Sequence, residues 1–257
     1  MSKRQKFIFS ALILSFSLFF VQFIDIDYRF YAIASLTLLT ALLTLWSLRE
    51  ALGGIRWGTT IILPSFFTAS IALFYFLLPP SAWLSRLPIV LFFAIGLYAL
   101  FLTENIFSVA AIRTIQLFRA ASAVGFLLTL VTCFLLFDTI FSFRLSYFFN
   151  SVLVFAVSLP LIFQALWSVN LEEKLTRPLL ISTLFLPLSL AQVALIISFY
   201  PLTTAISSLL LTTCTYVLIG LSQASFAQRL FRQTVYEYLA VVSIVLFIIL
   251  VTTRWGG

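Results

Sequence analysis

Long apolar runs, separated by short segments that carry most of the charges, are the dominant pattern of this 257-residue chain. An α-helix of about 17 to 25 apolar residues crosses a hydrocarbon core roughly 30 Å thick, and inside lipid every backbone amide must find its partner within the protein. Runs of this kind are therefore expected to be helices. Nine of them cover residues 7–24, 30–48, 60–78, 87–103, 120–137, 147–169, 178–199, 202–226 and 238–253.

Composition supports the same interpretation. Hydrophobic residues make up 63% of the chain and charged residues 9%, whereas about a quarter of the residues of a soluble domain are charged. The mean hydropathy is +1.18. We therefore predict an all-α integral membrane protein with about nine transmembrane helices, folded as a single multi-pass domain over residues 1–257. The net charge of +7 is spread thinly over the joints, which indicates membrane topology rather than binding of nucleic acid.

The positions of Lys and Arg predict the orientation, because these residues collect in short joints on the cytoplasmic side of a membrane. Eleven of the fifteen lie at the N-terminus or in the even-numbered joints, and four lie in the odd-numbered joints or near the C-terminus. We expect the N-terminus inside and the C-terminus outside, in the plasma or inner membrane of a cell. The basic segment 2–6 precedes the first run without a small-x-small cleavage site, so that run is expected to remain as a helix.

Short sequence matches suggest an internal duplication. Leu45-Trp46-Ser47 and Arg56 recur at one common offset as Leu166-Trp167-Ser168 and Arg177. The repeat units would be 7–119 and 120–232, with 238–253 as an extra helix. Four helices per unit give both copies the same orientation, which makes them parallel repeats. Chance similarity between apolar segments is the alternative.

The segment Glu172-Glu173-Lys-Leu-Thr-Arg177 resembles the first motif of the CPBP family of intramembrane proteases. Those enzymes also need histidines on neighbouring helices, and this sequence contains none. Without histidine it also lacks zinc-peptidase ligands and the usual general base. We therefore interpret the segment as a polar joint, and we expect no catalytic residue, no metal site, no cofactor and no enzymatic activity.

Ionisable residues lie at the ends of the predicted runs rather than near their centres. Glu104 and Glu237 come closest to the membrane interior, and we expect both at the interface. The joint 105–119 has Phe107 on one helical face and arginines on the other. It is predicted to lie along the inner surface, a helix that extends past the bilayer being the alternative. The candidate lipid-headgroup residues are Arg113, Arg119, Arg229 and Arg232.

Proline residues beside polar groups mark the best candidate for a ligand path, since proline frees a backbone carbonyl that can bind a substrate or an ion. Three of the later runs have this pattern, and Pro64 with Ser65 is a fainter counterpart in an earlier run. Ordinary helix packing by small polar residues is the alternative. The candidate substrate-binding residues are Ser158, Pro160, Gln164, Pro187, Ser189, Gln192, Thr212, Thr213 and Tyr216.

Two classes of function fit these features. One is a carrier or flippase for a hydrophobic or amphipathic small molecule. The other is a non-catalytic scaffold or accessory subunit of an envelope complex. The expected partners are membrane lipids, a second copy of the chain or another membrane protein. A water-accessible cavity between the sixth, seventh and eighth runs would favour the carrier, and dry packing throughout would favour the scaffold.

Overall fold

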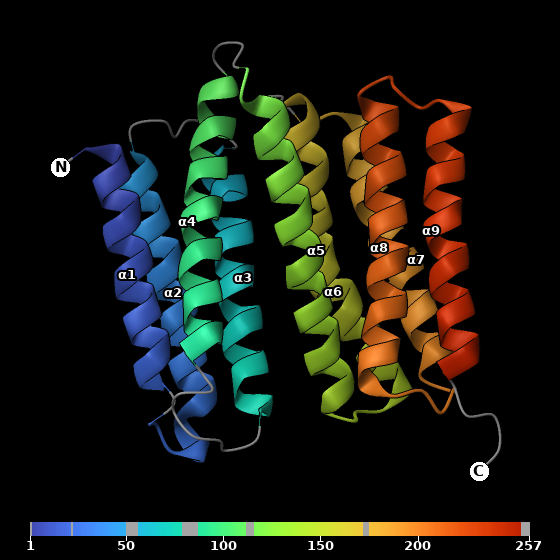
Figure 1. Ribbon diagram of the computed structural model, residues 1–257, viewed down its shortest axis with the longest axis horizontal. Helices are drawn as coiled ribbons and strands as arrows, with labels where there is room; N and C mark the ends of the chain where they lie inside the picture. The colour runs from blue at the N-terminus through green and yellow to red at the C-terminus, as the bar shows by residue number, and fades with distance from the viewer. Residues whose placement is uncertain are drawn as a thin grey trace. The chain divides into compact units, whose positions relative to one another are not determined.

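The computed structural model describes residues 2–21, 23–49, 56–78, 87–111, 116–171 and 175–252. The prediction of an all-helical chain is confirmed: these residues form nine α-helices that are long and apolar enough to cross a membrane (Figure 1). The elements are α1 (Lys3–Val21), the 3-10 turn η1 (Ile26–Tyr28), α2 (Arg29–Leu48), α3 (Arg56–Leu77), α4 (Leu87–Ala110), α5 (Phe118–Ser142), α6 (Tyr147–Asn170), α7 (Arg177–Ile197), α8 (Thr204–Phe226) and α9 (Arg232–Thr252).

Two helix ends were predicted wrongly. The run 87–103 was expected to end before Glu104, but α4 continues to Ala110. The run 120–137 was expected to end before Asp138, but α5 continues to Ser142. A single carboxylate does not stop a helix when no proline or glycine follows it and apolar residues continue the pattern. Both acidic residues therefore lie inside helices.

The predicted surface helix over 105–119 is also wrong in its first part. Residues 105–110 are the last turns of α4, where Phe107 is buried. This is the alternative in which the membrane helix extends further. Residues 112–115, and with them Arg113, lie outside the described residues.

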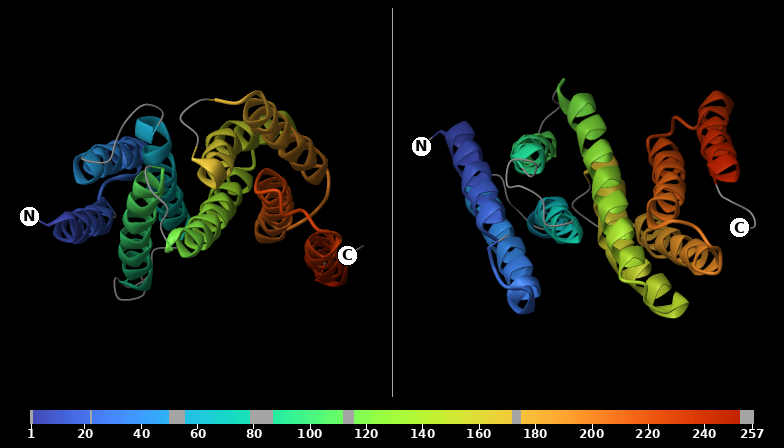
Figure 2. Two further views of the ribbon diagram at one scale, coloured as in Figure 1. Left: turned by 90° about the horizontal axis from the view of Figure 1, so that it is seen from above. Right: turned by 60° about the horizontal axis from the view of Figure 1, so that its bottom comes forward.

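The chain divides into two compact units, and α5 begins in the first and ends in the second. In the first unit α1 packs on α2 and α4, and α3 packs on α2 and α4 (Figure 2). Sequential neighbours are antiparallel, since Lys6 near the start of α1 lies over the ring of Trp46 near the end of α2, 5.6 Å from its centroid. Arg29 at the start of α2 likewise lies over Phe76 near the end of α3, at 4.9 Å.

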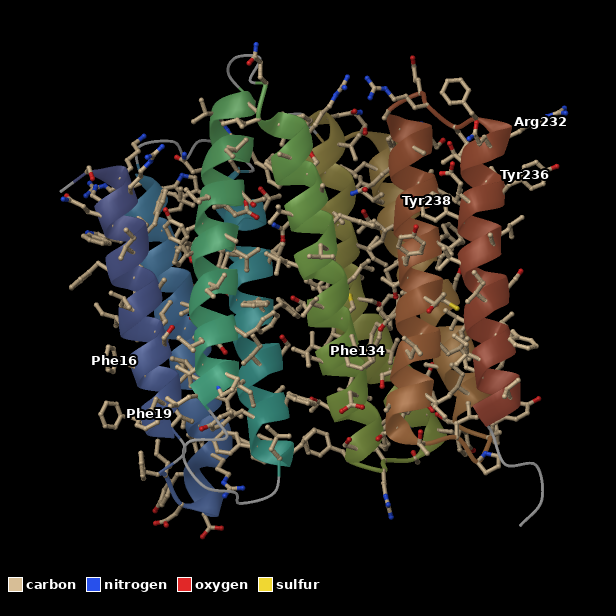
Figure 3. All side chains as sticks on the ribbon, viewed as in Figure 1. Phe16, Phe19, Phe134, Arg232, Tyr236 and Tyr238 are labelled. Atoms are coloured by element: carbon tan, nitrogen blue, oxygen red, sulfur yellow. The ribbon has the colours of Figure 1, made fainter. Side chains whose placement is uncertain are left out.

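In the second unit α6, α7 and α8 pack on one another, and α9 packs on α8. Asp138 of α5 accepts a hydrogen bond of 3.1 Å from the Ser208 hydroxyl of α8. The ring of Tyr238 on α9 lies against Gly220 of α8 and is 4.8 Å from the ring of Tyr216. Tyr236 points away from α8 (Figure 3), so α9 joins the unit through one face.

The residues of the predicted duplication lie in different surroundings. Trp46 is 41% exposed, whereas its counterpart Trp167 is 3% exposed. The helix pairs that would correspond, α2 with α3 and α6 with α7, both pack closely within their own units. The repeat units 7–119 and 120–232 remain a prediction.

The contact between α3 and α4 depends on a glycine. Phe67 is fully buried and stacks on Phe93, with 6.0 Å between the ring centroids. Its ring faces Gly96, where an added Cβ atom would collide with it. Phe92 closes another side of the ring, at 6.2 Å between centroids. The Phe67 ring therefore has little room to move aside.

We predict that Gly96→Ala destabilises the protein by about 1–3 kcal/mol, the usual cost of overpacking a filled interior. The measurement is the thermal unfolding midpoint of the purified protein in mild detergent. Gly58→Ala is the matched control, because it is also in a helix but has no atom within 4 Å of the added Cβ. Equal midpoints for the two variants would contradict the packing argument.

Candidate functional site

Two of the three predicted ligand residues of α6, Ser158 and Gln164, are buried, but the Ser158 hydroxyl bonds to its own helix. Ser158 is fully buried and donates to the Val154 carbonyl of its own helix at 2.6 Å. Pro160 lies inside α6, and Gln164 is buried. A hydroxyl that bonds to its own helix is an ordinary packing group in a membrane protein.

The predicted ligand residues of α7 and α8 do not all point into the interior of the unit. Pro187 is buried, but Ser189 and Gln192 are exposed on α7. The Ser189 hydroxyl donates to the carbonyl of Phe185 at 3.0 Å. On α8, both threonines donate to carbonyls one turn earlier, Thr212 at 2.7 Å and Thr213 at 2.8 Å. The substrate-binding role assigned to helices α6 to α8 stays a prediction.

The predicted headgroup arginines that the structure describes are all exposed. Arg119 is the second residue of α5, Arg229 follows the end of α8, and Arg232 begins α9. Figure 3 shows Arg232 at the end of its helix. These positions suit contact with lipid headgroups, and the role itself remains a prediction.

A different group of polar residues is brought together in the first unit. Its starting point is the contact between α1 and α2, where the hydroxyls of Ser10 and Ser47 are 3.0 Å apart and share a hydrogen bond. Both side chains are buried. This pair fixes one level of the helix bundle, about 10 Å from the start of α1 at a rise of roughly 1.5 Å per residue.

The contact between α2 and α3 brings Thr60 to the same level. Thr40 donates to the Thr68 hydroxyl at 3.1 Å, which sets the register of these antiparallel helices. Thr60 precedes Thr68 by eight residues, and Leu48 follows Thr40 by eight residues. Thr60 is therefore level with Leu48 and Ser47, and its side chain is 1% exposed.

The contact between α3 and α4 adds Thr103 and Glu104. The Phe67 ring faces Gly96, while Thr60 lies seven residues before Phe67 and Thr103 lies seven residues after Gly96. Antiparallel packing then places Thr103 level with Thr60, and Glu104 follows it. We refer to Ser47, Thr60, Thr103 and Glu104 as the polar layer; Ser10 lies further along the bundle than Glu104, because Phe7 stacks on Phe101 where α1 meets α4.

Glu104 is the chemically distinctive member of the polar layer. It is 0% exposed, although it had been expected at the membrane interface. Its helical neighbours at three and four residues, Leu100, Phe101, Phe107 and Ser108, are all buried. Ionisable groups are costly inside membrane helices and occur there mainly in ion, proton or substrate sites. The sequence held the signal, since Leu97, Leu100, Glu104 and Phe107 follow one helical stripe.

Thr60 contributes a backbone acceptor as well as a hydroxyl. Pro64, four residues later in α3, has no N–H to donate to the Thr60 carbonyl. In the next turn of α3, the buried Thr68 hydroxyl donates to the Pro64 carbonyl at 2.9 Å. The polar layer thus combines a carboxyl group, hydroxyls and a carbonyl that proline frees from the helix.

Basic residues surround the end of the first unit at which the layer lies. Lys3, Arg4 and Lys6 begin α1, and Arg49 follows α2. A carboxyl group below a basic rim can bind a cation, a proton or a hydrogen-bond donor of a larger molecule. The described residues contain no group of three or more His, Cys, Asp or Glu side chains that could hold a metal ion.

Comparison with known proteins gives one family. A family model described as a protein of unknown function (DUF5656) matches residues 9–252, which includes the polar layer and nearly all of the described helices. No curated protein and no solved structure matches the chain significantly.

We predict that Glu104 is protected from water-soluble carbodiimide in the folded protein in mild detergent. It should react once the chain is denatured, because a 0% exposed carboxyl is out of reach of a reagent in water. Glu237, exposed near the start of α9, is the internal control and should react in both states. Mass spectrometry of the modified peptides measures both sites, and labelling of Glu104 equal to that of Glu237 in the folded protein would contradict the burial.

Proposed function

The chain belongs to DUF5656, a family of proteins of unknown function, and we propose that it is a carrier in a cell membrane for a small hydrophobic or amphipathic molecule. The observation that carries this proposal is Glu104, a fully buried carboxyl group that helix register places near the level of buried hydroxyls on α2 and α3. We place the polar end of the transported molecule in this layer and its apolar part among the aromatic side chains nearby.

The energetics favour a functional role for the carboxyl over a structural one. Buried hydroxyls cost little, since most of them donate to their own helix, as Thr40 and Thr44 do at 2.9 and 2.7 Å. Burial of a carboxyl group costs far more than burial of a hydroxyl, and ionisable groups inside membrane helices occur mainly in ion, proton or substrate sites. A site that binds and releases a polar ligand is a reason to keep such a group.

The helix geometry supports the same location. Carriers commonly build their sites where a helix is interrupted and a carbonyl is freed. In this chain Pro64 interrupts the hydrogen bonding of α3 at Thr60, beside Ser47 on α2. The sequence had predicted the site on helices α6, α7 and α8. The site proposed here lies in the first unit instead.

We further propose that the N-terminus lies in the cytoplasm, because the basic residues of the first unit gather at the end where α1 begins. Trp46 and Trp57 are exposed near this end, and tryptophan is enriched at membrane interfaces. The polar layer would then lie close to the cytoplasmic surface, where a substrate could enter from inside.

The orientation predicts opposite labelling of two joints. After replacement of Cys133 and Cys214 by alanine, Ser146→Cys between α5 and α6 should react with an impermeant maleimide added to intact cells. Ser2→Cys should react only after the membrane is permeabilised. Both serines are exposed, so the reagent's access to them differs only by the side of the membrane on which each lies. Labelling of both positions in intact cells, or the reverse order, would contradict the topology.

The carrier role predicts that the polar layer opens to water. In the same cysteine-free background, Ser47→Cys and Thr60→Cys should react with a water-soluble thiol reagent added to inside-out vesicles, although both positions are buried in the structure. Ala72→Cys, equally buried on α3, is the control and should react more slowly. The readout is the labelling rate.

The outcome distinguishes the two classes of function. If the polar-layer positions react no faster than the Ala72 position, the layer is static. The carrier proposal would then be withdrawn in favour of an accessory membrane subunit. Unaltered elution of each variant in size-exclusion chromatography controls for misfolding.

A further inference from the structure

An apolar groove runs between α1 and α4 on the surface of the first unit. It has a volume of about 360 Å³ and is lined by Ile8, Ala11, Leu12, Ala94, Ile95 and Tyr98. The small side chains of Ala11 on α1 and Ala94 on α4 leave room for the groove. This volume lies in the range of small-molecule sites, roughly 300–1,000 Å³. Since Ile8 and Leu12 are about half exposed, the groove faces the surroundings rather than the polar layer.

Polar groups lie at the end of the groove toward the N-terminus. Arg4 is one turn before Ile8 in α1, on the same helical face, and is exposed. Asn105 is two turns after Tyr98 in α4 and therefore also on the face of the groove. Because the Phe7 and Phe101 rings stack with centroids 6.0 Å apart, Arg4 and Asn105, each about one turn beyond, reach a similar level.

The amide of Asn105 has an unmet hydrogen-bonding requirement. Its Oδ1 atom is buried and accepts no hydrogen bond within the described part of the chain. A buried acceptor of this kind normally has a partner. A donor from a molecule seated in the groove would provide it, and the amide N–H groups could in turn donate to a phosphate.

We propose that the groove between α1 and α4 holds one acyl chain of an anionic phospholipid, with its phosphate at Arg4 and its headgroup at Asn105. Charge complementarity selects this occupant, since exposed Arg4 lies one turn beyond a groove lined by apolar side chains, and Lys3 and Lys6 add positive charge to the same end of α1. Exposed Trp46, over which Lys6 lies, marks the same level as an interface. The proposal rests on the membrane-spanning part of the proposed function and not on the carrier role.

The arrangement also explains the exposed face of α1. Arg4, Ile8, Leu12 and Phe16 follow one another at four-residue spacing, all exposed, and Phe16 points away from the other helices of the unit (Figure 3). This stripe offers a basic group at headgroup level and apolar side chains below it. A phospholipid has the same order of groups along its length.

The test is native mass spectrometry of the full chain, purified in mild detergent and mixed with equal amounts of phosphatidylglycerol and phosphatidylethanolamine. The wild type should retain one phosphatidylglycerol in preference to phosphatidylethanolamine. Arg4→Gln should lower that preference about fivefold, the effect of one basic group near an anionic lipid. Ala94→Phe, which fills the groove, should abolish retention of that lipid.

Two matched variants control for general effects. Arg177→Gln removes an exposed arginine at the start of α7, and Ala240→Phe adds a ring to the exposed face of α9; both should retain lipid as the wild type does. Retention by Ala94→Phe equal to that of Ala240→Phe would overturn the proposal. So would an unchanged preference in Arg4→Gln. A change in oligomeric state with Ala94→Phe, at unchanged lipid retention, would assign the groove to a second copy of the chain and also overturn it.

Discussion

The rest of this structure depends on one constraint, that polar groups inside a membrane-spanning helix must find their partners within the protein. Serine and threonine meet it cheaply, because their hydroxyls reach the carbonyl one turn earlier. Thr132 and Thr215 are both fully buried and both do so, at 2.7 and 2.9 Å. The chain can therefore bury many hydroxyls in α-helices without building a site. Hydroxyl content alone does not locate a function in such a protein.

The same constraint makes the few exceptions informative. Glu104 is a fully buried ionisable group, which costs far more to bury than a hydroxyl does, and the Thr60 carbonyl loses its helix donor at Pro64. Both features occur near one level of the first unit, where the register of α2 on α3 also places Ser47. The coincidence of these two features is a stronger argument for a site than the predicted serines and threonines of α6 to α8, since Ser158, Ser189, Thr212 and Thr213 each donate to their own helix.

The number and order of the described helices could be predicted from the sequence, because they depend on local properties of the chain. Run length and apolar content placed nine helices among the described residues in the correct order, because lipid leaves the chain no other backbone structure. The helix ends at Ala110 and Ser142 were missed, since a lone Glu104 or Asp138 was taken to end a run. A helix continues through one carboxylate when packing on both sides of it is retained.

The candidate sites were less predictable, because they depend on which helices are neighbours. The polar layer requires the register of α2 against α3, which rests on Thr40 and Thr68. The groove requires α1 beside α4, a contact between segments more than 80 residues apart along the chain. A single sequence carries no record of such pairings. Prolines beside polar residues pointed to α6 and α7, and the threonines of α8 were added to them, although Gln192 of α7 is exposed.

The polar layer also bears on the hypothesis of an internal duplication. At the offset that aligns Leu45-Trp46-Ser47 with Leu166-Trp167-Ser168, Ser47 corresponds to Ser168, but Thr60 corresponds to Ile181 and Glu104 corresponds to Ser225. The buried carboxyl and its threonine are thus absent from the second copy. If the copies share an origin, the second has kept the helix packing and lost the expensive polar groups. Selection for packing alone would remove those groups from both copies, so their retention in the first unit favours the location proposed for the site.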